Sequence, residues 1–406
     1  MSVGGIDIKR VYSPHSPERC DTSMSCARPN VRIFEPKKDK DYFAPMKWYI
    51  EHGKKSGGQA DNKATQARRE RELKKMIKDG TAVLIPCKRC QGCIMDRGKS
   101  WANRMEMELP YHENAWFFTL TYDNDHVPKS YDQGLGVNKE TGEIETENLT
   151  LNFKDLEEFW KRLRRWTEYH NRAIMTEYKG KMKNDLMYYA GGEYGGKTHR
   201  PHYHAIVYGL NIQKDELKEY KKERGKQYYT CEWLNKVWGK GYVVIGAAEW
   251  ESMAYTARYC TKKAYGSDAK KYYESLAVVP EESRQSKTPA IGWRYYEEHK
   301  DEIYDKDSIQ LKNGKRCKPP TYFDKLFDLE HSDAKPLTAK ECEAIEDLII
   351  KAESEELKAI KRKRRKIAND ALFAQLKQTG LTMQEYYELK NRKNQEKFSQ
   401  LIREEV

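Results

Sequence analysis

The stretch from residue 115 to residue 264 limits the fold more than any other part of the sequence, because strand-like runs alternate there with helical patterns. Ala115–Tyr122 (AWFFTLTY) is apolar and rich in aromatic residues, which predicts a central strand. Asp185–Gly195 and Pro201–Leu210 predict two further strands, and the short GKTHR connection between them predicts a hairpin. The run GYVVIGAAE, which begins at Gly241, predicts a fourth strand.

Helical patterns separate these strands. The segment FKDLEEFWKRLRRW has apolar residues at helical spacing on one face, namely Leu156, Phe159, Trp160 and Leu163. The segments CEWLNKVWGK and Ser252–Ala264 predict two more helices. The order strand, helix, strand, strand, helix, strand, helix predicts an α+β fold, in which an antiparallel sheet has its helices packed on one face.

Composition divides the chain into three expected parts. Residues 1–80 contain frequent Pro and Gly, which predicts an irregular, basic N-terminal region with one short basic helix at 62–80. Residues 81–330 would form the main domain. Residues 331–406 predict a charged helical tail that carries the run KRKRRK at 361–366. Thr382 and Glu385 have the spacing of a capping box, which predicts the start of a last helix.

The charge balance points to a partner class. The chain has 75 Lys and Arg against 63 Asp and Glu, a formal net charge of +12, which favours nucleic acid. The KRKRRK run suits phosphate contacts, although such runs also occur on solvated helix faces. The longest apolar stretch, Tyr242–Ala248, is far shorter than the roughly 20 residues of a spanning helix. The N-terminus also lacks the apolar core of a secretory signal, so we expect a cytoplasmic protein without a membrane partner.

Three cysteines, Cys87, Cys90 and Cys93, form a C-x-x-C-x-x-C motif. This spacing suits a zinc ion if a fourth ligand comes from elsewhere, and Cys20 and Cys26 are the candidates. The alternative is a set of reduced thiols at the turn before a helix. The sequence leaves both interpretations open.

Two histidines, His202 and His204, lie two residues apart on a predicted strand, so their imidazoles share one face. If the hairpin turns around residues 197–198, Glu193 lies opposite His202 on the same face. Two imidazoles and a carboxylate suit Mg²⁺ or Mn²⁺. Packed histidines beside an ordinary strand carboxylate are the alternative, and a register slip of one residue would turn Glu193 to the other face.

A second candidate group lies on the last predicted helix. Tyr255 and Tyr259 are one helical turn apart, and Lys262 falls on the same face. A helix can also use two tyrosines for core packing. A lysine in register with them is unusual for a core face, which favours a catalytic role.

The chain resembles the rolling-circle replication initiators of the HUH endonuclease superfamily in the order of three motifs, FFTLTY, HYH and Y-x-x-x-Y-x-x-K. Three further segments are similar to microvirus initiators of the gokushovirus type, and the similarity runs from about residue 85 to 330. These segments are GGEYGGKTHRPHYHAIVYG, PCKRCQGC and TPAIGWRYYEEHKDEIYDKDSIQLKNGKRCKPPTYFDKLFD.

The resemblance implies an HUH endonuclease domain at residues 81–330, with a family-specific extension and a sheet of ferredoxin-like or RNA-recognition-motif-like topology. It implies that a tyrosine nicks the viral replicative form at the origin, forms a 5′-phosphotyrosine link, frees a 3′-hydroxyl primer and later rejoins the displaced strand as a circle. The residues that would carry this chemistry are the metal ligands Glu193, His202 and His204, the nucleophiles Tyr255 and Tyr259, and Lys262 beside them.

The implied partners are viral origin DNA, single-stranded and in the replicative form, and a host helicase and polymerase in the cytoplasm of the bacterial host. Two alternatives stay open. One is another HUH enzyme, a relaxase or a transposase, although relaxases usually place their tyrosine before the histidine motif. The other is a non-catalytic single-strand DNA-binding or packaging protein, which would bind DNA without cleaving it.

Overall fold

The computed structural model describes residues 25–35, 40–258, 269–312, 314–331 and 354–403. The chain forms two compact units. The sheet unit comprises Arg97–Glu298, and the terminal unit combines Met1–Asp96 with His299–Val406. Within the described parts of the chain, no helix is both long and apolar enough to cross a membrane.

A seven-stranded antiparallel sheet forms the centre of the sheet unit, with the order β12-β7-β8-β4-β11-β10-β9. Its strands are β4 (Ala115–Tyr122), β7 (Met187–Tyr194), β8 (Pro201–Tyr208), β9 (Lys218–Glu223), β10 (Lys226–Thr230), β11 (Gly241–Ala247) and β12 (Ser283–Gln285). The four predicted strands are all present, which confirms the α+β antiparallel fold. The sequence did not predict the outer strands, because β9, for example, is exposed along its whole length and lacks an apolar pattern.

The inner four strands and two helices have ferredoxin-like topology. The chain passes through β4, α5 (Phe153–Tyr169), β7, β8, α6 (Glu232–Trp238) and β11. The strands lie side by side in the order β7-β8-β4-β11. This is the β-α-β-β-α-β arrangement that the family resemblance implies.

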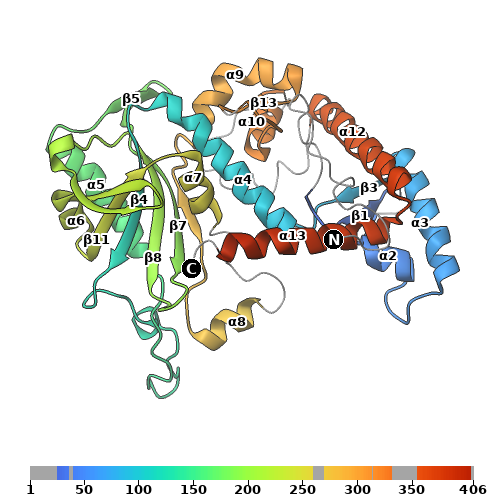
Figure 1. Ribbon diagram of the computed structural model, residues 1–406, viewed down its shortest axis with the longest axis horizontal. Coiled ribbons are helices and arrows are strands. Elements are labelled where there is room, and N and C mark those ends of the chain that lie inside the picture. The colour runs from blue at the N-terminus through green and yellow to red at the C-terminus, as the bar shows by residue number, and fades with distance from the viewer. Residues whose placement is uncertain (1–24, 36–39, 259–268, 313, 332–353, 404–406) are drawn as a thin grey trace. The chain divides into compact units, whose positions relative to one another are not determined.

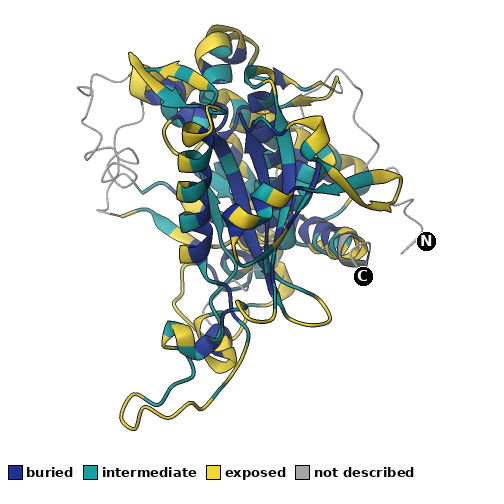
Figure 2. Cartoon of the chain, turned by 90° about the vertical axis from the view of Figure 1, so that its left-hand side faces the viewer, coloured by how far each residue is buried: buried dark blue, intermediate teal, exposed yellow. Residues whose placement is uncertain are grey.

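Helices cover both faces of the sheet, not one face as the element order predicted. α5 and α6 pack on one face, where Leu156, Phe159, Trp160 and Leu163 are buried as expected. α7 (Trp250–Ala257) and the end of α4 (Gln91–Glu108) pack on the other face, around Phe117, Tyr189 and Ile206 (Figure 1). β8 is therefore buried at nearly every position, as expected for a strand covered on both sides (Figure 2).

Short elements complete the sheet unit. They are η1 (Leu109–Tyr111), η2 (Ser130–Gln133), the two-stranded sheet of β5 (Met175–Tyr178) and β6 (Lys181–Asn184), η3 (Lys214–Glu216) and α8 (Ala269–Leu276). α9 (Trp293–Lys306) begins in this unit and ends in the terminal unit.

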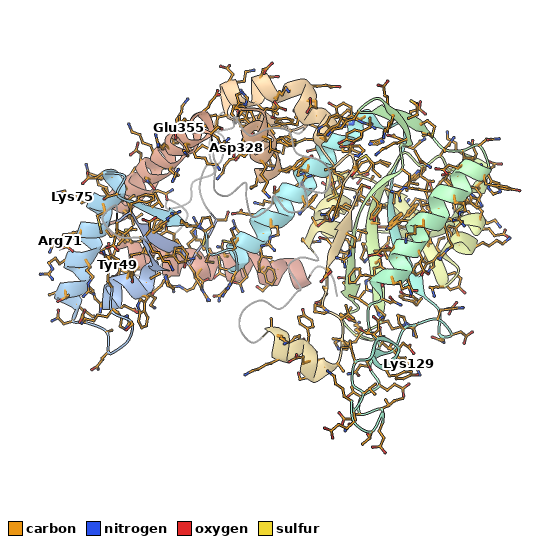
Figure 3. The ribbon with its side chains drawn as sticks, turned by 180° about the vertical axis from the view of Figure 1, so that it is seen from behind. Tyr49, Arg71, Lys75, Lys129, Asp328 and Glu355 are labelled. Atoms are coloured by element: carbon orange, nitrogen blue, oxygen red, sulfur yellow. The ribbon has the colours of Figure 1, made fainter. Side chains whose placement is uncertain are left out.

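The terminal unit contains more regular structure than the composition of the N-terminal region predicted. A three-stranded sheet has the order β2-β1-β3, and its strands are β1 (Asn30–Ile33), β2 (Tyr42–Pro45) and β3 (Ala82–Ile85). The other elements are α2 (Met46–His52), α3 (Lys63–Lys78), β13 (Ile309–Gln310), β14 (Arg316–Cys317), α10 (Thr321–His331), α12 (Glu355–Thr379) and α13 (Met383–Arg403). α3 is the predicted basic helix, and Figure 3 shows Arg71 and Lys75 projecting outward from it.

The charged tail belongs to the core of the terminal unit. The core residues come from early and late segments alike and include Val31, Tyr49, Ile50, Leu73, Leu372, Leu376, Met383 and Tyr386. The predicted capping box is present, because Thr382 N–H donates to Glu385 Oε2 (2.9 Å) and Glu385 N–H donates to Thr382 Oγ1 (3.2 Å). The tail is therefore a folded pair of helices and not a separate extension.

The KRKRRK run in α12 has one structural cation among exposed ones. Arg364 donates to Asp307 Oδ1 at 2.7 Å and to Asp324 Oδ2 at 2.8 Å, and its side chain is mostly buried. Arg362, Lys363, Arg365 and Lys366 are exposed. The run therefore supplies an internal anchor as well as a basic surface.

Candidate active site

The hairpin of β7 and β8 has the predicted register. Glu193 pairs with His202, and Gly191 pairs with His204. Because side chains alternate between faces along a strand, Glu193, His202 and His204 share one face. The glycine opposite His204 leaves room beside its imidazole.

The three side chains converge on a small volume. His202 Nε2 lies 2.6 Å from Glu193 Oε1, and His204 Nε2 lies 3.3 Å from the same oxygen. One ligand atom from each residue lies within 4.8 Å of the other two. Glu193 and His204 are buried, whereas His202 is partly exposed, so the cluster can be approached from the side of His202.

The outer nitrogens of both imidazoles have hydrogen-bond partners that orient the rings. Thr119 Oγ1, on the neighbouring strand β4, lies 3.0 Å from His204 Nδ1. His202 Nδ1 donates to the backbone carbonyl of Arg200 at 3.2 Å. Both Nε2 atoms are thereby directed at Glu193, an arrangement that is typical of metal-binding histidines.

The charge of Glu193 depends on these imidazoles. Burial alone would raise the pKa of this carboxyl group. Hydrogen bonds from His202 and His204, together with their positive charge, outweigh burial and hold the pKa of Glu193 well below its usual range. The carboxylate is therefore ionised at neutral pH, the form that binds a cation.

α7 brings Tyr255 to the same cluster. Its ring packs edge-on against the His204 imidazole, with 5.0 Å between ring centroids. The Phe117 ring lies parallel to the His204 imidazole at 5.5 Å between centroids, and it also contacts the Tyr255 ring at 6.2 Å. The Arg258 guanidinium, at the end of α7, lies 5.3 Å from the centre of the Tyr255 ring. The fold thus places a phenol, a cation and a three-residue ligand set together.

Comparison with known proteins identifies the family. Residues 115–264 match the family model of the replication-associated protein ORF2. The chain is 33% identical over 253 residues to the replication-associated protein ORF2 of Spiroplasma virus 4, covering 61% of this chain and 69% of that protein. The chain belongs to the replication-associated protein family. This confirms the resemblance to microvirus initiators of the gokushovirus type.

Two other relatives carry similar names. The replication-associated protein VP4 of Bdellovibrio phage phiMH2K is 29% identical over 262 residues, which cover 64% of this chain and 72% of that protein. The replication-associated protein ORF4 of Chlamydia phage 1 is 31% identical over 264 residues, which cover 62% of this chain and 57% of that protein. No solved structure matches the chain.

Four of the six predicted site residues of this replication-associated protein lie together in the structure, namely Glu193, His202, His204 and Tyr255. Tyr259 and Lys262 lie outside the described residues. The sequence reasoning missed Phe117, Thr119 and Arg258. Thr119 alternates with apolar neighbours in FFTLTY, which marked a polar face, but the pattern did not show which strand would lie beside it.

Proposed function

We propose that this replication-associated protein initiates rolling-circle replication by nicking the viral replicative form at its origin. The observation that carries this proposal is the contact between Tyr255 and His204, because it sets a nucleophile beside a ligand set for a divalent cation. The family membership supports a role in phage replication, and the geometry supports phosphodiester cleavage.

The donor set fits a divalent cation. Glu193, His202 and His204 offer one carboxylate oxygen and two imidazole nitrogens, and contacts with Thr119 and Arg200 orient the rings. Such a mixed set suits Mn²⁺ or Mg²⁺ with positions left for phosphate oxygens. When bound, the cation withdraws charge from a non-bridging oxygen of the scissile phosphate.

Tyr255 is the proposed nucleophile of the cleavage step. Its hydroxyl oxygen attacks the phosphorus, the bond from phosphorus to the 3′-oxygen breaks, and the phenol proton passes to the released 3′-oxygen. A phenol has an unperturbed pKa near 10, so a neighbouring cation favours its ionised form. Arg258 lies next to the Tyr255 ring and serves this role, and Lys262 is a second candidate by its spacing.

A second nucleophile, Tyr259, completes the cycle. While one tyrosine holds the 5′ end of the displaced strand, the other cleaves the regenerated origin. The new 3′-hydroxyl then attacks the first phosphotyrosine and releases a closed circle. The phosphotyrosine bond retains the energy of the cleaved phosphodiester, so this rejoining needs no ATP.

This chemistry specifies the proposed partners. The protein would bind the viral origin as replicative-form and as single-stranded DNA in the cytoplasm of the bacterial host. The freed 3′-hydroxyl would prime a host polymerase, and a host helicase would open the duplex ahead of it.

A nicking assay tests the proposal. Supercoiled replicative-form DNA incubated with the protein and Mn²⁺ is expected to become nicked, with the protein covalently attached to the 5′ end at the nick. A parallel reaction with a chelator should leave the DNA supercoiled. A mobility shift without any nick would instead identify a non-catalytic DNA-binding or packaging protein.

Substitutions in α12 test the contribution of its basic surface to binding. Changing the four exposed cations to glutamine should weaken DNA binding and reduce the slope of log K against log salt by about 0.9 for each phosphate that is no longer neutralised. Glutamine has nearly the same helix propensity as lysine and arginine, so α12 should persist. The residues to change are Arg362, Lys363, Arg365 and Lys366.

The control for this experiment is Arg364→Gln, which removes the ion pairs with Asp307 and Asp324. It should lower the melting temperature more than the quadruple variant does and reduce the salt slope less. Charge substitution is preferable to deletion of the tail, because deletion would also remove Leu372 and Leu376 from the core. An unchanged slope in the quadruple variant would mean that the run does not contact DNA.

A further inference from the structure

Four thiols that the proposed chemistry does not use converge in the terminal unit. The Sγ atoms of Cys26, Cys87, Cys90 and Cys93 all lie within 4.8 Å of one another. Cys26, Cys90 and Cys93 are buried, at 0%, 6% and 9% exposure. Of the two candidates from the sequence for a fourth member, Cys26 joins the motif, and Cys20 lies outside the described residues.

The spacing of the sulfurs suits a tetrahedral metal and not a disulfide. The Sγ atoms of Cys26 and Cys90 are 3.8 Å apart. A tetrahedron with Zn–S bonds of about 2.3 Å has sulfurs separated by roughly 3.8 Å. A disulfide needs sulfurs at about 2.05 Å, and all four cysteines are free thiols.

Backbone amides around the cluster favour thiolates. The N–H of Ala27 donates to Cys90 Sγ at 3.4 Å, and the N–H of Cys87 donates to Cys26 Sγ at 3.3 Å. Within the motif, Cys90 N–H donates to Cys87 Sγ at 3.3 Å across a tight turn in which Lys88 has a φ of 61°. Hydrogen bonds to the charged form of a ligand stabilise that form, and thiolate is the form that binds metal.

Separate parts of the terminal unit hold Cys26 at the motif. A Cβ on Gly92 would lie 2.0 Å from the Ser25 carbonyl oxygen, so only glycine allows this close approach of the two segments. Asn394 of α13 donates to the same carbonyl at 2.9 Å, and Ser25 N–H donates to Asp96 at 3.3 Å. The segment that carries Cys26 is therefore attached to the first turns of α4 and to α13.

We propose that Cys26, Cys87, Cys90 and Cys93 bind one structural zinc ion. Soft thiolates select zinc over the hard cations that suit Glu193 and the histidines. Four protein ligands close the coordination shell, which is typical of structural sites and leaves no position for a substrate. The ion would join the segment at residues 25–27 to the start of α4 in a small core that has few large apolar residues.

Metal analysis of the full-length protein tests this proposal. After purification with zinc in the medium and dialysis, the wild type should retain about one zinc per chain, and Cys87→Ser and Cys93→Ser should retain less than about a tenth of that. Cys317→Ser, which lies in the same unit outside the cluster, should retain it fully. His204→Ala should also retain it, because that residue belongs to the other ligand set. Zinc absent from the wild type, or lost with His204→Ala and retained by the Cys87 and Cys93 variants, would overturn the assignment.

A measurement on the wild type keeps the test valid if the cysteine variants fail to fold. X-ray absorption at the zinc edge should show four sulfur neighbours at about 2.3 Å. Replacement of the zinc by Co²⁺ should give the visible absorption bands of a tetrahedral cobalt thiolate. A shell dominated by nitrogen and oxygen would contradict the proposal. This readout does not depend on DNA cleavage, so it stands apart from the outcome of the nicking assay.

Discussion

The double variant Tyr255→Phe, Tyr259→Phe is expected to form no covalent adduct with a single-stranded origin oligonucleotide, whereas each single variant still forms one. Cleavage needs only one phenol, but release of circular strands needs alternation between two, so both single variants should fail to release circles. The measurement uses an oligonucleotide labelled at its 3′ end, because the proposed link retains the downstream fragment on the protein.

This result separates a nucleophile from a packing residue. Tyr255 packs against His204 and Phe117 through its ring, which phenylalanine keeps, so stability should change by less than about 1.5 kcal/mol. Tyr242→Phe, on the exposed side of β11, is the matched control and should behave as wild type. An adduct formed by the double variant would refute the assignment of both tyrosines.

Substituting either histidine of the ligand set should abolish cleavage and spare DNA binding. His202→Ala or His204→Ala removes a metal ligand, and the metal acts mainly in the transition state. Most affinity for DNA comes from backbone phosphates, so the dissociation constant should change by less than about tenfold, roughly 1.4 kcal/mol. Nicking rates and salt-matched binding isotherms provide the two measurements.

The controls for the histidine variants address folding and specificity. His170→Ala changes an exposed histidine at the end of α5 and should leave both nicking and binding unchanged. Loss of an imidazole also removes a hydrogen bond from the buried Glu193, so the variants should melt at a lower temperature but remain folded. Nicking at a near wild-type rate by either variant would show that these histidines do not hold the catalytic metal.

Local patterns in the sequence were sufficient wherever the interacting residues are close in the chain. The apolar spacing in residues 153–169 determined which face of α5 is buried, because helical periodicity is a property of neighbouring residues. The short turn between β7 and β8 determined that Glu193 lies opposite His202, since a hairpin of known turn position has one register. The capping box of Thr382 and Glu385 is local in the same sense.

Contacts between distant segments were decided only by the tertiary structure. Tyr255 reaches His204 because α7 packs on the second face of the sheet, and the element order did not determine that face. Thr119 orients His204 because β4 lies beside β8, a pairing across 85 residues. Such pairings depend on which apolar surfaces bury each other best, and many arrangements satisfy the same local patterns.

The terminal unit shows the same division most clearly. The C-x-x-C-x-x-C spacing identified three members of the thiol cluster, but Cys26 joins them through contacts of Ser25 with Gly92 and Asn394. The charged pattern of residues 355–403 correctly predicted helices, whereas their packing against β1, α2 and α3 came from a few apolar residues among many charges. The sequence alone determined the local elements and the ligand hairpin, and the tertiary structure decided their partners, because burial is a collective property of segments that are far apart in the chain.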